Sequence, residues 1–378
     1  MDFDLTDDQK LLTDSVSKLL ADRYTFEARK GFQKQPEGWS PDMWGQFADM
    51  GLLGLPFDEA YGGFGGGAVD VMLVMEQFGK ALVLEPYLAT VVLAGTALRL
   101  AGTEAQKSAL LPEIVGGALK MAFAHGEQGS RYDLSDVQTT ARPAGDGWVL
   151  DGAKAVVLHG GSADKLVVSA RTAGDRNDRD GITLFLVDAD AKGVGRRSYQ
   201  LRDGTRAAEV SLSAVQVGAD AVLGRVGGAY PVISRVVEAG ISALAAEVVG
   251  GMDKMLDVTL EYLRTRHQFG KAIGENQVLQ HKAADMLMSL EQGRSMSMLA
   301  AMMVDEPDDA ERERNIAMAK VGVGQAGKFV SQNAVQLHGG IGMTEEYVIG
   351  HYFRRAMMFD HSFGDTAYYL AKLASQVQ

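Results

Sequence analysis

Residues 262–281, YLRTRHQFGKAIGENQVLQH, hold the densest group of side chains that could bind a charged ligand. Arg264, Arg266 and His267 stand beside an aromatic residue and a glycine, at the end of a pattern that predicts a helix. A cationic turn after a helix is suited to anchoring an anion such as a phosphate, because arginine donates paired hydrogen bonds to it. A solvated arginine cluster on an ordinary helix–helix turn would contain the same residues, so both interpretations stay open.

A second segment, QLHGGIGMTEEY at 336–347, is rich in glycine. Gly339, Gly340 and Gly342 carry no side chain that would hold a ligand away from the backbone, and Gln336 and His338 can hydrogen-bond it. Taken alone, the segment is more typical of a helix C-cap followed by a tight turn.

A single carboxylate stands in the apolar run AGISALAAEVVGG at 239–251. On a helix, Glu247 shares its face with small and apolar residues, namely Gly240, Ala243, Leu244, Gly250 and Gly251. Burial disfavours the charged form of a carboxylate, which suits a general base that works near neutral pH. The competing interpretation is a core glutamate paired with an arginine from another helix.

The chain that positions these residues has 378 residues, which is long enough for two or three packed units. Hydrophobic residues make up 46% of it, enough for sizeable cores. The formal net charge of −12 argues against nucleic acid or an anionic membrane as the main partner. The absence of cysteine excludes disulfides, thiolate nucleophiles and cysteine-based zinc sites. The seven histidines are scattered without metal-ligand spacing, so we expect no metal site.

The first residues, MDFDLTDDQK, are acidic and lack the apolar core of a secretory signal. The sequence also lacks the long uncharged apolar stretch that a spanning helix needs, so we expect no membrane insertion. Together these features predict a cytoplasmic protein.

The residue patterns divide the chain into three blocks. Residues 1–120 are predicted to be helical, with a capping box that begins at Thr6 and an N-cap at Ser40. Residues 121–225 contain short strand-like runs without intervening helices, which predicts a β-barrel or sandwich. Residues 226–378 return to long helical patterns, within which charged DEPDDAERERN at 305–315 is predicted to be an exposed connection between two helices. The predicted fold class is therefore α+β.

The order of helices, strands and helices, together with RTRHQFG, ENQVLQH and QLHGGIGMTEEY, resembles the acyl-CoA dehydrogenase superfamily over essentially the whole chain. Segments such as VLEPYLATVVL and KAVVLHGGSADKLVVSARTAG are most similar to the small subunits of pimeloyl-CoA dehydrogenases. The resemblance implies FAD held between the β domain and the C-terminal helices. It also implies a C-terminal four-helix bundle that assembles as a homotetramer or as an α2β2 pair with a related larger subunit.

The resemblance also implies the reaction, which is α,β-dehydrogenation of an acyl-CoA thioester to the trans-2-enoyl-CoA. A carboxylate would remove the α-proton while hydride leaves for the flavin, and electron-transfer flavoprotein would accept the electrons. The two glycine-containing segments would then clamp the FAD diphosphate across a dimer interface. The residues that map onto this clamp are Arg266, Gln268, Phe269, Gln277, Gln336, Gly339 and Gly340.

The chain departs from the family pattern at the catalytic base. The usual glutamate of a Tyr-Glu-Gly-Thr segment maps onto Gly364, and the known alternative position maps onto Gly240, which we expect to line the substrate site. Two helical turns along the same helix face from that position, Glu247 is the first candidate for the base. Asp365, next to the lost glutamate, is the second.

The flavin-facing wall is altered as well. Gly126, Val156 and Leu158 stand where the family has threonine, tryptophan and threonine, which removes hydrogen bonds and a stacking surface. Ser130 and Arg131 keep a polar, cationic patch at the expected substrate entrance. A non-catalytic or half-site subunit of a heteromeric dehydrogenase is therefore an alternative to a dehydrogenase that is active by itself, and a flavin monooxygenase on the same fold is a third hypothesis.

Overall fold

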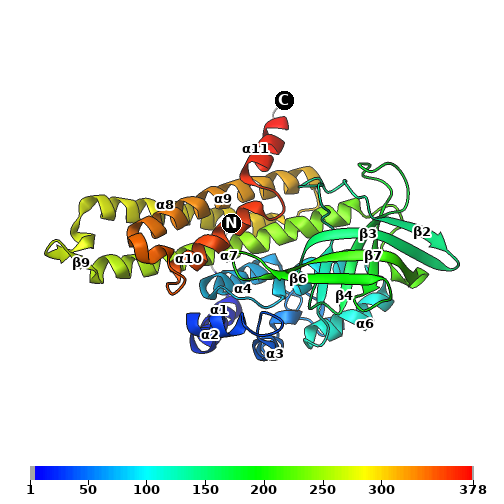
Figure 1. The fold of residues 1–378 in the computed structure, drawn as a ribbon, viewed down its shortest axis with the longest axis horizontal. Helices are drawn as coiled ribbons and strands as arrows, with labels where there is room; N and C mark the ends of the chain where they lie inside the picture. The colour runs from blue at the N-terminus through cyan, green and yellow to red at the C-terminus, as the bar shows by residue number, and fades with distance from the viewer. Residues whose placement is uncertain (1–4, 377–378) are drawn as a thin grey trace. The chain divides into compact units, whose positions relative to one another are not determined.

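The computed structural model describes residues 5–376, and Figure 1 shows the order of their helices and strands. The α-helices are α1 (Asp7–Arg23), α2 (Phe26–Phe32), α3 (Pro41–Asp49), α4 (Ala68–Ala81), α5 (Gly95–Ala101), α6 (Glu104–Val115), α7 (Tyr230–Thr265), α8 (Gln277–Met303), α9 (Asp309–His338), α10 (Ile349–His361) and α11 (Thr366–Ser375). The strands are β1 (Met121–Ala124), β2 (Thr140–Ala144), β3 (Gly147–Leu158), β4 (Lys165–Arg171), β5 (Ile182–Asp188), β6 (Val194–Gln200), β7 (Arg206–Gly218), β8 (Val222–Leu223), β9 (His267–Gln268) and β10 (Lys271–Ala272). The predicted α+β class, with a helical, a β and a second helical domain in that order, is confirmed.

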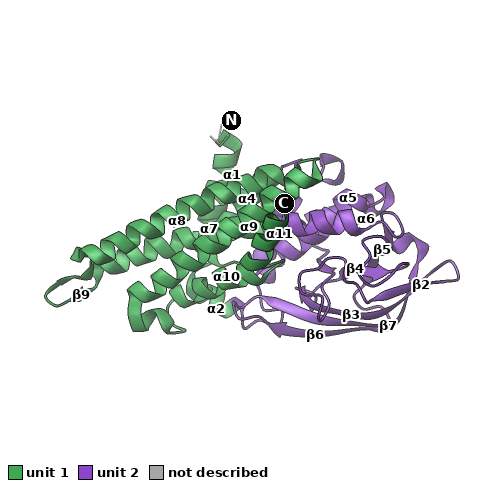
Figure 2. Ribbon diagram, turned by 90° about the horizontal axis from the view of Figure 1, so that it is seen from above, with its two compact units in different colours: residues 1–31, 68–83, 241–378 green, residues 32–67, 84–240 purple. Residues whose placement is uncertain are grey.

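By its internal contacts the chain forms two units, which Figure 2 colours separately. Unit 1 comprises residues 1–31, 68–83 and 241–378 and is built from helices and the small β9–β10 hairpin. Unit 2 comprises residues 32–67 and 84–240 and contains the large sheet together with α3, α5 and α6.

The starts of the helices follow from local sequence. At α1 the Thr6 hydroxyl accepts from the Gln9 backbone N–H, and the Gln9 side chain accepts from the Thr6 N–H, both at 3.2 Å. At α3 the Ser40 hydroxyl accepts from the Met43 N–H at 3.2 Å, and Pro41 takes the first helical position, where no N–H is needed. The predicted capping box and the predicted N-cap are confirmed.

Unit 2 is organised around one eight-stranded sheet with the order β6-β7-β3-β2-β4-β5-β8, in which β1 also pairs with β4. Neighbouring strands are antiparallel except for β1–β4 and the single β2–β4 pair, which are parallel. One face of the sheet buries a core that includes Leu150, Leu166, Val168, Phe185 and Val210. This core holds the strands whose loops carry the candidate site residues of unit 2.

In unit 1, α7, α8 and α9 run side by side (Figures 1 and 2), and α4 packs backbone to backbone against α7. A Cβ at Gly250 would lie 1.9 Å from the Glu76 carbonyl oxygen, and one at Gly79 would lie 1.8 Å from the Glu247 carbonyl oxygen. Only glycine permits so close an approach. The small face predicted around Glu247 therefore packs against another helix of the same unit.

The predicted exposed connection at 305–315 is wrong in its second half, because α9 already begins at Asp309. Arg312, in the first turn of α9, is only 2% exposed. Its guanidinium donates to the Glu306 carbonyl oxygen and to the Asp309 carboxylate, each at 2.6 Å. The charges that indicated a loop are therefore the acidic first turn of a helix and a buried arginine that binds it.

Candidate functional site

The cationic segment after α7 forms a β-hairpin instead of a simple turn. Strands β9 and β10 pair through Gln268 and Lys271, and Phe269 and Gly270 make the turn with φ angles of 54° and 81°. Positive φ at both turn residues matches the twist of a two-residue hairpin, although phenylalanine adopts it rarely. Phe269 is 99% exposed, and Arg266 is exposed at the base of the hairpin. The hairpin thus presents its side chains to any molecule that reaches this end of unit 1.

The second predicted segment caps α9. Gly339 has φ of 61° and ψ of −140°, and its N–H donates to the carbonyl oxygens of Val335 and Gln336. The C-cap interpretation of this segment is therefore confirmed. The cap also leaves the backbone accessible, because a Cβ at Gly339 or Gly340 would meet no atom of the described residues within 4 Å.

The fold brings these two segments to the same end of unit 1. The ring of His338 stacks on Tyr262, one turn before the hairpin, with the ring centroids 4.5 Å apart. Lys282 of α8 donates to the Asn333 side-chain oxygen at 3.3 Å, which ties the first turns of α8, where Gln277 is exposed, to the last turns of α9. Predicted clamp residues that are far apart in the sequence therefore lie on one end of the helical unit.

The donors at this end fit the diphosphate of FAD. Arg266, Gln268, Gln277 and Gln336 are all exposed and supply a guanidinium and carboxamides, and the glycine backbone can approach an anion without a side chain in the way. Burial lowers the pKa of His338, so that its imidazole is neutral at pH 7 and adds no charge. The guanidinium would therefore provide the charge attraction and the amides the additional hydrogen bonds.

Glu247 is a buried carboxylate paired with an arginine. The residue is 5% exposed, and its Oε1 lies 3.6 Å from Nη1 of Arg355 on α10. Arg355 also donates from Nη2 to the Val83 carbonyl oxygen at 2.8 Å. The structure thus shows the core pairing that the sequence left open as the competing interpretation. A cation at this distance favours the charged carboxylate over the neutral acid.

Arg355 is one of several side chains that bind carbonyl groups at the C-terminal end of α4. Tyr352 donates to the Lys80 carbonyl oxygen, and Arg29 donates from Nε to the Leu82 carbonyl oxygen at 2.7 Å. The last carbonyls of a helix have no partner within the helix, and cations are favoured there. The negative charge of Glu247 on α7 therefore faces an arginine that already binds a carbonyl group next to the end of α4.

The turn before α11 leaves no room for a side chain at Gly364. Its φ is 122°, and a Cβ would lie 2.4 Å from Cε2 of Tyr369. Asp365 is the N-cap of α11, and its Oδ1 accepts from the Tyr368 N–H at 2.7 Å. The second candidate base is thus engaged in capping a helix.

The predicted substrate residues of unit 2 differ in accessibility. Gly240 is buried on α7. Ser130 is 7% exposed, and its hydroxyl donates to the Glu127 carbonyl oxygen at 2.9 Å and accepts from the Glu127 N–H at 3.3 Å. Arg131 is exposed, with φ of 48°. Of these residues, only Arg131 presents a charged side chain that an incoming substrate could contact.

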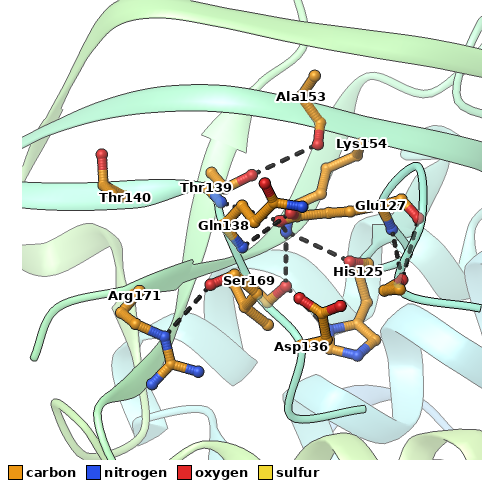
Figure 3. A network of polar contacts seen from close by, with 12 residues as sticks. His125, Glu127, Asp136, Gln138, Thr139, Thr140, Ala153, Lys154, Ser169 and Arg171 are labelled. Carbon is orange, nitrogen blue, oxygen red and sulfur yellow. Dashed lines mark hydrogen bonds and ion pairs between the residues drawn. The ribbon is translucent and has the colours of Figure 1, made fainter. Parts of the chain in front are cut away.

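A buried ion pair anchors the loop that carries Ser130 and Arg131 (Figure 3). Lys154 Nζ lies 2.6 Å from Glu127 Oε1, and their side chains are 0% and 4% exposed. The Glu127 carboxylate also accepts from the backbone N–H groups of Gln138 and Thr139 at 2.8 and 3.0 Å. Because both ends of the loop meet this carboxylate, the pair fixes the loop against β3.

Burial sets the protonation states in this network. It lowers the pKa of Lys154 to about 8, against the raising effect of the Glu127 carboxylate. Burial, aided by the Lys154 charge, lowers the pKa of His125 to about 3, so the imidazole is neutral beside Ser169 Oγ at 2.9 Å. Burial raises the pKa of Glu127, but the Lys154 ammonium and hydrogen bonds from Thr139 outweigh it and hold the pKa below its usual value. Removing one member of such a pair costs about 3–5 kcal/mol.

The predicted flavin wall coincides with a bulge in β3. The Ala155 N–H donates to the Gly126 carbonyl oxygen at 2.8 Å, which joins one altered position to the residue before another, Val156. The pairing of β3 with β7 shifts register within this segment, as a β-bulge requires. Val156 has φ of 53° and is 52% exposed, and Leu158 is half-buried. The bulge therefore exposes an apolar side chain on a strained backbone.

Sequence reasoning missed the partners of the buried charges. Lys154 carried a signal of its own, since a lysine flanked by apolar residues in a predicted strand is unusual unless it is paired. Nothing in the sequence around Glu127 or Arg355 indicated that either is paired. Their partners are remote in the sequence, and only the packing of strands and helices brings them together.

Among residues 5–376, no group of three or more histidine, aspartate or glutamate side chains is arranged to hold a metal ion. Over the same part of the chain, no helix is both long enough and apolar enough to cross a membrane.

Comparisons with known proteins agree with one another. Family models described as the N-terminal, middle and C-terminal domains of acyl-CoA dehydrogenase match residues 6–118, 122–216 and 231–378. A probable acyl-CoA dehydrogenase of Bacillus subtilis (strain 168) is 30% identical over 376 residues, which cover 95% of this chain and 95% of that protein. The structure of butyryl-CoA dehydrogenase from Megasphaera elsdenii is 27% identical with a TM-score of 0.91 and covers 100% of both chains. A structure of the Tcur3481-Tcur3483 steroid ACAD is 29% identical with a TM-score of 0.88 and covers 98% of both chains.

Proposed function

The chain belongs to the acyl-CoA dehydrogenase family, and from this we propose that it oxidises an acyl-CoA thioester to the trans-2-enoyl-CoA with bound FAD. Members of this family are oxidoreductases that act on CH–CH bonds with a flavin. The observation that carries the proposal is the group of phosphate-suited donors at one end of unit 1, where the His338–Tyr262 stack joins two distant segments. FAD, when bound, supplies the oxidant that takes up hydride from the β-carbon.

The chain's own residues divide the remaining tasks. Arg266 and the exposed carboxamides bind the FAD diphosphate. Glu247 takes the α-proton, because it is a buried carboxylate that the Arg355 guanidinium keeps in the charged, proton-accepting form. Asp365 is a weaker candidate, because its carboxylate already caps α11.

The acyl group in this proposal is a dicarboxyl chain such as pimeloyl. The support comes from the segments that resemble pimeloyl-CoA dehydrogenase small subunits and from the exposed guanidinium of Arg131, which can pair with a distal carboxylate. The proposal also includes electron-transfer flavoprotein as the electron acceptor and a cytoplasmic location.

A second candidate is a half-site subunit in an α2β2 assembly, which lends Arg266 and Gln336 to the flavin of a partner. The depleted wall at Gly126 and Val156 favours it, because a flavin ring would find little stacking surface there. The name of the Tcur3481-Tcur3483 steroid ACAD joins two components, which is consistent with such an arrangement in a relative.

The visible spectrum of the purified chain tests the proposal. We expect flavin absorbance that pimeloyl-CoA bleaches under anaerobic conditions, and bleaching by pimeloyl-CoA that slows when Arg131 is replaced by glutamine. Arg266→Gln should weaken FAD binding by at least about tenfold, because a charge-assisted contact to phosphate is lost. Arg314→Gln, an exposed arginine near the start of α9, is the matched control and should leave FAD affinity unchanged.

Two results would contradict the enzyme as proposed. A colourless chain that gains flavin only with a second subunit would establish the half-site function instead. Bound flavin that no acyl-CoA reduces would rule out dehydrogenation.

A further inference from the structure

Arg171, the last residue of β4, is a buried arginine that binds two loops of unit 2 at once (Figure 3). It is 8% exposed. Its guanidinium nitrogens donate at 2.8–3.4 Å to six backbone carbonyl oxygens, those of Ser135, Val137, Ala173, Arg176, Asp178 and Asp180. The first two acceptors lie in the β1–β2 loop (125–139) and the other four in the β4–β5 loop (172–181). One side chain therefore joins two segments that are separate in the sequence.

The two loops also contact each other directly. Arg176 Nε and Nη2 donate to the carboxylate oxygens of Asp136 at 2.5 and 2.8 Å. The Val137 N–H donates to the Arg176 carbonyl oxygen at 3.2 Å, and Asn177 Nδ2 donates to Asp133 Oδ2 at 3.4 Å. Neither loop contains a helix or a strand, so these bonds and those of Arg171 take the place of the hydrogen bonds of regular structure.

A continuous series of hydrogen bonds leads from Arg171 to the turn that carries Arg131. Arg171 Nη2 donates to the Ser135 carbonyl oxygen at 2.8 Å. The Ser135 N–H and hydroxyl both donate to Asp133 Oδ1, at 2.9 and 2.6 Å, and the Asp133 N–H donates to the Ser130 carbonyl oxygen at 3.0 Å. Arg131 lies inside this last turn, exposed, with φ of 48°. A residue with a side chain keeps such a conformation only where the surrounding structure holds it.

We propose that Arg171 is a positioning residue, which holds the two loops together so that the Arg131 guanidinium meets the distal carboxylate of a dicarboxyl acyl-CoA. This inference rests on the proposed function, since it assumes that class of substrate. Arg171 touches no substrate in this account, because carbonyl groups of the loops already occupy its donors. A guanidinium suits the task, since its five N–H groups are fixed in one plane and donate in several directions at once.

A ratio of rates separates positioning from stability. An arginine–carboxylate contact depends on the position and the orientation of both groups. A displaced turn should therefore weaken recognition of the distal carboxylate and leave recognition of the rest of the substrate unchanged. A residue that merely stabilised unit 2 would change the amount of folded protein, which would lower the rates for all substrates by the same factor.

The test measures the second-order rate constant of flavin reduction under anaerobic conditions, in whichever assembly holds flavin, for pimeloyl-CoA and for heptanoyl-CoA. Their acyl chains have the same length, and only the pimeloyl chain ends in a carboxylate. We expect Arg131→Gln to lower the ratio of the pimeloyl to the heptanoyl rate constant about tenfold. Arg171→Met and Arg171→Lys should each lower it at least about fivefold, because neither new side chain can bind both loops.

The same variants in an Arg131→Gln background separate positioning from a direct effect of charge. There they should change the ratio less than about twofold, because the side chain that Arg171 positions is absent. A direct attraction between Arg171 and the substrate would persist in both backgrounds and would be kept by Arg171→Lys. Arg196→Met is the matched control and should leave the ratio unchanged. Arg196 also donates to several carbonyl oxygens of unit 2, at 2.9–3.2 Å, but in another turn, those of Gly160, Gly161 and Ala163.

Thermal melting shows which variants fold. If neither Arg171 variant folds, Arg176→Gln decides the question, because it breaks the ion pair with Asp136 and leaves the bonds of Arg171 in place. It should lower the ratio at least about threefold, and only when position 131 is arginine.

An unchanged ratio in the variants that fold, or equal falls in both backgrounds, would overturn the inference while the proposed function stands. An unchanged ratio in Arg131→Gln would overturn the assignment of the distal carboxylate to Arg131 and the inference with it. Flavin that neither acyl-CoA reduces would overturn both the inference and the proposed function.

Discussion

Replacing Glu247 by glutamine separates its two proposed roles, the proton acceptor and the partner of Arg355. The substitution keeps the size of the side chain and one oxygen acceptor but removes the negative charge. If Glu247 is the base, the rate of flavin reduction by acyl-CoA should fall about 10²–10⁴-fold, the usual contribution of a positioned base. The decrease in the free energy of unfolding should be modest by comparison.

The effect on stability follows from the geometry of the pair. The glutamate side chain is 6% exposed and the arginine side chain 11%, so the interaction is only weakly screened by water. Removing one member of a buried pair costs about 3–5 kcal/mol. Because the amide oxygen of glutamine still accepts from Arg355, we expect a loss of about 1–3 kcal/mol in the free energy of unfolding. For a packed unit of this size, that corresponds to a fall of roughly 2–12 °C in melting temperature.

Arg355→Met is the matched variant, since it leaves the carboxylate and removes the cation. We expect it to lower the free energy of unfolding by about 3–5 kcal/mol, because the bond to the Val83 carbonyl is lost as well. Its rate of flavin reduction should fall at neutral pH and recover as the pH rises, because the carboxylate loses the cation that favours its charged form but can still accept a proton once it is ionised. Anaerobic stopped-flow spectroscopy gives the rates, and denaturant titration gives the free energies.

Two results would refute the reasoning. If Glu247→Gln keeps the wild-type rate while retaining FAD, Glu247 is a structural partner of Arg355 and the base lies elsewhere. If the two variants lose rate in proportion to their loss of stability, the effect on rate comes from altered packing.

Two further predictions concern neighbouring features. Gly364→Ala should lower the free energy of unfolding by about 1–3 kcal/mol, because its Cβ would lie 2.4 Å from the Tyr369 ring at φ of 122°, and unchanged thermal melting would contradict this contact. Stability should also fall as the pH decreases from about 6.5 towards 4.5, because the unfolded chain protonates His125 there whereas the folded chain, with a His125 pKa of about 3, does not. The free energy of unfolding should change by about 1 kcal/mol per pH unit in this range. Denaturant titrations at several pH values should show a smaller change for His125→Gln. An unchanged pH dependence in that variant would mean that other groups cause it.

The sequence by itself determined the parts of the protein that depend on neighbouring residues. The capping box at Thr6 and the N-cap at Ser40 formed as predicted, because each requires hydrogen bonds that span only three residues. The order of helical, β and helical domains is confirmed as well. The prediction of an exposed connection at 305–315 is wrong in part, because the charged residues of a first helical turn resemble those of a loop.

The candidate site could be predicted only as a set of residue types. Arg266 and Gln336 were chosen from motifs, and their roles in binding FAD remain predictions, although the structure places their segments at one end of unit 1. The carboxylate at 247 was identified from its apolar surroundings. Those surroundings could not reveal whether a cation faces it.

Only the tertiary structure decided which groups meet. The pairing of Glu247 with Arg355 and that of Glu127 with Lys154 depend on how helices and strands pack, and no periodicity in the sequence records such a contact. The same holds for the valine at 156, whose φ of 53° occurs where the pairing of β3 with β7 shifts register. Electrostatic energy and steric strain depend on distances of a few ångströms between remote segments, and the chain fixes those distances only when it folds.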